Sequence, residues 1–149
     1  MNIEQIKNRS VADTIRAMCD AAENPTTKLD ADTFGWVKNG EKCGCFALNL
    51  AERDLERILT NDEIETWELR AEVFGVDLDW FENYQDAINS LRQGDLANYN
   101  CFANHAGLQR IPDAFLDYEL PVLKTDFTPA QIEEYRKFAD VLDAPCGSR

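Results

Sequence analysis

Residues 33–59, TFGWVKNGEKCGCFALNLAERDLERIL, contain the features that decide the fold. Asn39 and Gly40 supply the two positive-φ positions of a tight type I′ turn, so residues 33–46 are expected to form a short β-hairpin. Apolar residues then recur at intervals of three and four, which predicts an amphipathic helix that starts at Cys45 and runs to the end of the stretch. A hairpin that leads directly into a helix makes this stretch the organising element of the chain.

Hydrophobic spacing and capping signals predict further helices on both sides of this stretch. The strongest signal is near the C-terminus, where Thr128, Pro129 and Gln131 form a capping box with proline in the first helical turn. A second capping box, Thr60 with Glu63, predicts a helix immediately after the organising stretch. The expected helices span about residues 10–22, 45–59, 60–74, 77–93, 95–106 and 128–143, with a short helical turn at 112–118.

Together these signals predict a mainly α fold with an orthogonal or bundle-like arrangement of about six helices and one small hairpin. Strands and helices do not alternate as they would in a parallel sheet. A chain of 149 residues is long enough for one domain that buries about 70% of its unfolded surface. We expect this domain to span residues 1–143, followed by a flexible tail at 144–149.

Composition restricts the location and the partners of the protein. The chain has no apolar run of about 18 residues and no signal-peptide core at its start, so it is expected to be cytoplasmic and not to bind membranes. A net charge of −13 and a pI near 4.4 argue against direct nucleic-acid binding, which needs clustered lysine and arginine. No glycine-rich phosphate loop is present, so no nucleotide cofactor is expected. Five cysteines do not form an even disulfide framework and are expected to be reduced.

Cys45 and His105 are the first candidate site. His105 is the only histidine in the chain, so any mechanism that uses imidazole as a base must use it. Cys45 is expected at the N-terminus of a helix, where unpaired amides and the helix dipole lower the pKa of a thiol. The pair supports an alternative function as a cysteine-nucleophile hydrolase or transferase. The other interpretation is a buried structural cysteine and a hydrogen-bonded histidine.

Two short segments around these residues resemble a known family. Residues 43–47, Cys-Gly-Cys-Phe-Ala, are similar to the sequence around the nucleophile of papain-type cysteine proteases. Residues 104–106, Asn-His-Ala, are similar to the surroundings of that family's histidine. The resemblance covers eight residues and implies a nucleophilic role for Cys45 and a base role for His105.

The same part of the chain offers a second alternative, a structural zinc site. Cys43, Cys45, Cys101 and His105 are four ligands of the type that zinc prefers, and the last two are one helical turn apart. A domain of this size does not need a metal to fold. Our expectation is therefore that the chain holds no metal and no cofactor.

The acidic face is the feature that we favour as the binding site. Residues 52–86 hold twelve carboxylates and three arginines, a local charge of −9 (3 − 12). Glu65, Glu68 and Glu72 repeat at intervals of three and four, a spacing at which like charges on a helix repel by about 0.2–0.5 kcal/mol per pair. A helix that keeps such charges without interleaved lysines is suited to a cationic partner. The other interpretation is a solvated face that confers solubility.

Trp36, beside Gly35 on the expected hairpin, either closes the core or stands exposed as an interface anchor. With the acidic face, it leads us to expect an acidic interaction or regulatory protein that binds a basic macromolecular partner. The partner would be a protein with a basic surface. A DNA-mimic inhibitor, whose carboxylates stand in for phosphates, is one form of this function. Homo-oligomerisation is left open.

Overall fold

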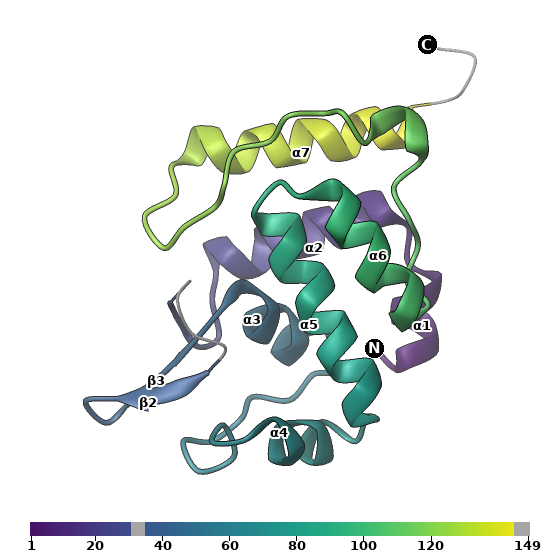
Figure 1. Cartoon of the computed structure of the whole chain (residues 1–149). Coiled ribbons are helices and arrows are strands. Elements are labelled where there is room, and N and C mark those ends of the chain that lie inside the picture. Colours follow the sequence, from purple (N-terminus) through teal and green to yellow (C-terminus); the bar gives the residue numbers. More distant parts are fainter. Residues whose placement is uncertain (31–34, 145–149) are drawn as a thin grey trace.

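The computed structural model describes residues 1–30 and 35–144 and confirms a mainly helical, single-domain fold (Figure 1). The described residues form seven α-helices, one 3-10 turn and a small three-stranded mixed sheet. The helices are α1 (Ile3–Asn8), α2 (Val11–Glu23), α3 (Phe46–Asp54), α4 (Trp67–Phe74), α5 (Leu78–Arg92), α6 (Leu96–Ala106) and α7 (Pro129–Asp143), and the 3-10 turn is Asp113–Phe115.

Helix α3 lies at the centre of the molecule. All residues from Phe46 to Glu52 are buried, because α3 packs against α2 on one side and α5 on the other. Around this centre, α5 and α6 form an antiparallel pair, α7 lies along α2 at one end, and α4 packs on α5 at the opposite end (Figure 1). The stretch expected to organise the fold therefore supplies its most buried helix.

The predicted hairpin forms, with β2 (Trp36–Lys38) antiparallel to β3 (Glu41–Gly44). Asn39 and Gly40 have φ values of 54° and 77°, as a type I′ turn requires. The expected range began at residue 33, and residues 33 and 34 lie outside the described part of the chain. Sequence reasoning missed β1 (Lys28–Leu29), which pairs parallel to β3 and makes it the central strand.

The structure corrects two predicted helices. Helix α3 ends at Asp54, because Glu56 adopts a left-handed conformation with φ of 54°. Ile58, one of the apolar residues in the helix predicted to run to residue 59, is therefore 58% exposed. The capping-box hydrogen bonds between Thr60 and Glu63 form, but the chain continues as a turn.

Helix α4 begins only at Trp67, seven residues after Thr60, and is capped by Thr66. The side chain of Arg70 stabilises the non-helical segment before α4, because its Nε donates to the carbonyl of Ile64 at 2.7 Å. The Ile64 carbonyl therefore accepts from a side chain, where a helix would pair it with a backbone amide. The short helical turn predicted at 112–118 is also shorter in the structure. It is the 3-10 turn Asp113–Phe115.

Three further helices begin at a residue whose side chain caps the first turn. Asp77 caps α5, Asp95 caps α6, and Thr128 forms the predicted capping box of α7 with Gln131. Along residues 1–30 and 35–144, no helix combines the length and apolar content that crossing a membrane would require.

Candidate functional site

Arg70 brings the two predicted binding elements together. Its Nε donates to the carbonyl of Ile64, and its Nη2 donates to the carbonyl of Gly35 at 2.9 Å. Ile64 directly precedes Glu65, and Gly35 directly precedes Trp36. One guanidinium therefore ties the start of the hairpin to the segment that leads into α4, and both lie at the same end of the molecule (Figure 1).

Close contact at this junction requires glycine. Gly35 has a φ of 145°, and a Cβ at this position would lie 3.0 Å from Cγ1 of Ile64 and 3.2 Å from Cζ of Arg70. Ile64 is itself fully buried. The backbone of the hairpin can thus lie against the buried side chain of Ile64 only because no side chain intervenes.

Trp36 is exposed, as one of its two predicted interpretations requires. It is 48% exposed on β2, an edge strand of the sheet, and the ammonium of Lys38 lies 5.9 Å from the centre of its ring. Val37 beside it is also exposed. An exposed tryptophan on an edge strand is a large apolar surface that the domain does not use in its own core.

Glu65, Glu68 and Glu72 are all exposed, but only the last two are on a helix. Glu65 precedes Thr66, the N-cap of α4, so the expected run of three on one helix is wrong. Glu68 lies in the first turn of α4, where the helix dipole stabilises a negative charge. Within the described part of the chain, no lysine or arginine forms an ion pair with these three glutamates.

Two carboxylates counted in the acidic stretch are not on the surface. Glu52 is 1% exposed and accepts hydrogen bonds from Lys42 Nζ at 2.6 Å, from the Leu59 amide at 2.8 Å and from the Thr27 hydroxyl. Asp54 is 5% exposed and is paired in bidentate geometry with Arg9, with both distances 2.8 Å. These two residues stabilise the interior of the protein, so the acidic surface is smaller than the sequence indicated.

Cys45 caps α3 as predicted, but its thiol is buried. The sulfur accepts from the Leu48 amide at 3.4 Å and from Nδ2 of Asn89 at 3.8 Å, and the residue is 1% exposed. Burial raises the pKa of the Cys45 thiol, and the hydrogen bonds that favour the thiolate do not reverse this shift. The expected lowering of this pKa is therefore wrong.

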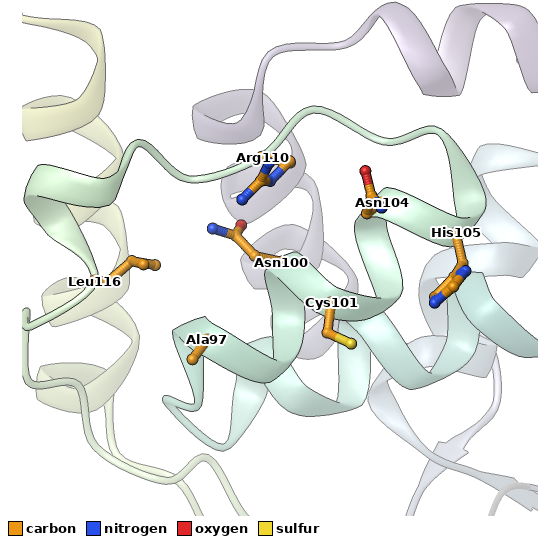
Figure 2. A pocket seen from close by; sticks show the side chains of 7 residues that line it. All are labelled: Ala97, Asn100, Cys101, Asn104, His105, Arg110 and Leu116. Carbon is orange, nitrogen blue, oxygen red and sulfur yellow. The ribbon is translucent and has the colours of Figure 1, made fainter.

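His105 lies elsewhere, on the exposed side of α6. It lines an open pocket of about 330 Å³ together with Cys101, Asn104 and Arg110 (Figure 2). Cys45 is not among the residues that line this pocket, and no hydrogen bond joins Cys45 to His105 among the described residues. The proposed nucleophile is thus in the core, whereas the proposed base is at the surface.

The four-ligand zinc alternative is not supported either. Cys43 and Cys45 belong to the buried junction of β3 and α3, whereas Cys101 and His105 are exposed on α6. Over residues 1–30 and 35–144, no three cysteine, histidine or acidic side chains are grouped so as to hold a metal.

Sequence reasoning missed Arg70, the residue that positions both binding elements. A signal was present, since Arg70 is the cation beside Ala71 in the apolar stripe of α4, and the structure shows it 3% exposed. Its guanidinium also lies 5.4 Å from the ring centre of Trp67. Comparison with protein-family models, with curated proteins and with solved structures found no match to this chain.

Proposed function

We propose that the protein binds a basic surface of another protein through an acidic–aromatic face formed by Trp36, Glu65, Glu68 and Glu72. The observation that carries the proposal is the double hydrogen bond of Arg70, which fixes the segments that hold Trp36 and Glu65 against each other. An exposed tryptophan and unpaired carboxylates on segments joined in this way offer both an apolar anchor and electrostatic steering.

The distribution of charge elsewhere supports this choice of face. Between α2 and α7, Arg16 pairs with Asp140 at 2.9 Å and with Asp143 at 2.5 Å, and Arg136 pairs with Asp20 at 3.0 Å and also with Glu23. Each of these four acids forms an ion pair with one of two arginines of the chain. The acids of the acidic–aromatic face have no such cation among the described residues, so a partner can supply it.

Affinity capture with charge-reversed variants tests the proposal. The chain and the variant Glu65→Lys/Glu68→Lys/Glu72→Lys are used as baits, and the captured proteins are quantified by mass spectrometry at two salt concentrations. We expect a basic partner to be captured at least tenfold less by the variant, and less by the native chain at high salt. Trp36→Ala should also reduce capture, because it removes the apolar anchor.

A matched control separates the face from the net charge. Glu119, Glu133 and Glu134 are exposed, and Glu119→Lys/Glu133→Lys/Glu134→Lys changes the charge by the same amount away from α4. This control should keep its capture. Equal capture by the native chain and the two triple variants, or equal loss of capture in the two triple variants, would contradict the proposed face. The narrower DNA-mimic form also requires that duplex DNA compete with the protein for the captured partner.

A further inference from the structure

We propose that Cys101 and His105 form a two-residue binding site for a zinc-class divalent cation on the outward side of α6. The residues are four apart in a continuous helix, and side chains at that spacing are neighbours with Cβ atoms about 5–6 Å apart. Both are exposed and both line the same open pocket. Figure 2 shows the two side chains on the same side of α6, with the sulfur directed toward the end of the helix that holds His105.

The two donor atoms select the class of metal. Thiolate sulfur and imidazole nitrogen are ligands that zinc prefers, whereas calcium and magnesium require oxygen ligands. On binding, the Cys101 thiol releases its proton to solvent and the sulfur donates an electron pair to the metal, while His105 binds through a neutral ring nitrogen. No electron is transferred. Two protein ligands leave the other positions of the ion to water, so binding should be weaker than at a four-ligand structural site.

The fold makes Cys101 the accessible thiol. Among the described cysteines, Cys19, Cys43 and Cys45 are buried and Cys101 is exposed. The net charge of −13 favours the approach of a cation. Arg110 is the cation that lines the pocket, and Figure 2 draws its side chain nearer to Asn100 than to Cys101. The site uses α6, so it is independent of the acidic–aromatic face.

A cobalt titration tests the site in the reduced chain of 149 residues. Cys146 lies outside the described residues, so a Cys146→Ser background removes its thiol. We expect one equivalent of Co²⁺ to produce a thiolate-to-cobalt charge-transfer band that Zn²⁺ abolishes. Cys101→Ser should remove the band, and His105→Gln should weaken binding at least tenfold. Asn98→Ala, at an exposed position of the same helix that does not line the pocket, is the matched control and should bind within about twofold of the background.

A second measurement needs no substitution of a ligand. Zinc should slow alkylation of Cys101 by iodoacetamide in the native protein, as measured by peptide mass spectrometry. The proposal is overturned if the background gives no band, if the band survives Cys101→Ser, if His105→Gln binds as tightly as the background, or if zinc leaves alkylation unchanged. None of these outcomes bears on partner capture, so the two proposals fail separately.

Discussion

At the scale of single residues, the interior depends on carboxylates that the sequence assigns to the surface. Glu52 occupies a helix face between two apolar neighbours, Leu48 and Leu55, but its own side chain is completely buried. It joins α3 to the strand that holds Lys42 and to the backbone at Leu59. The carboxylate therefore fixes the path of the chain after α3.

We expect Glu52→Ala to lower the free energy of unfolding by about 3–5 kcal/mol, because the substitution leaves a buried ammonium without its partner. The Lys42 side chain is only 10% exposed, and the Leu59 amide would also lose its acceptor. Glu52→Gln should lower stability less, since its amide oxygen still accepts a hydrogen bond. Urea unfolding followed by circular dichroism measures both changes.

Glu82→Ala is the matched control, because Glu82 is an exposed glutamate on α5. Its unfolding free energy should stay within about 0.5 kcal/mol of that of the parent chain. A small effect of Glu52→Ala, similar to that of Glu82→Ala, would show that the buried network contributes little to stability.

At the scale of elements, two glycines that end helices allow conformation to be separated from packing. Gly75 follows α4 and Gly94 follows α5, with φ values of 71° and 74°. A Cβ on Gly75 would meet nothing within 4 Å, whereas a Cβ on Gly94 would lie 2.6 Å from the carbonyl oxygen of Leu120. The φ angle is nearly the same at both positions, but the surroundings differ.

We therefore expect Gly75→Ala to lower the free energy of unfolding by about 1–2 kcal/mol, the cost of a left-handed conformation. Gly94→Ala should lower it by about 1–3 kcal/mol more, because the backbone around Leu120 must also move. Equilibrium urea unfolding of the two variants gives the difference. If both variants lost the same stability, the contact with Leu120 would not restrict position 94.

The elements of the fold also show which structural features can be predicted from sequence patterns. Local signals were sufficient for the Asn39-Gly40 turn and for the capping box of Thr128 with Gln131, because both depend on residues near in sequence. The patterns failed where distant residues decide the conformation. Arg70 acts on a carbonyl 35 residues away, and the pairing of β1 with β3 joins Lys28 to Cys43. Neither contact produces a periodic pattern in the sequence.

At the candidate sites too, relations between residues near in sequence could be predicted, whereas relations between distant residues could not. Exposure of Glu68 and Glu72 could be predicted from helical spacing. The separation of Cys45 from His105 could not, since it depends on the burial of α3 and the outward orientation of one side of α6. Cys101 and His105 are neighbours because they share one helix, and that relation was visible in the sequence.

At the scale of the whole molecule, burial of ionisable groups should make the free energy of unfolding fall at alkaline pH. Burial raises the pKa of Cys19 to about 12 and also raises the pKa of Cys45. In the unfolded chain these thiols ionise near pH 8.5. Above that pH the folded state keeps protons that the unfolded state loses, so the free energy of unfolding falls as pH rises.

Each of these thiols should contribute a slope of up to about 1.4 kcal/mol per pH unit above pH 9.5. Urea unfolding of the reduced protein at intervals between pH 7 and 10.5 measures this slope. Below about pH 8 the thiols are protonated in both states, so they should leave the free energy of unfolding nearly constant. Cys19→Ala should make the slope shallower by the contribution of one group, whereas Cys101→Ser, at an exposed position, is the control. Equal slopes in the parent chain and in Cys19→Ala would mean that the Cys19 thiol ionises as easily in the folded state as in the unfolded one, which the packing of α2 against α7 opposes.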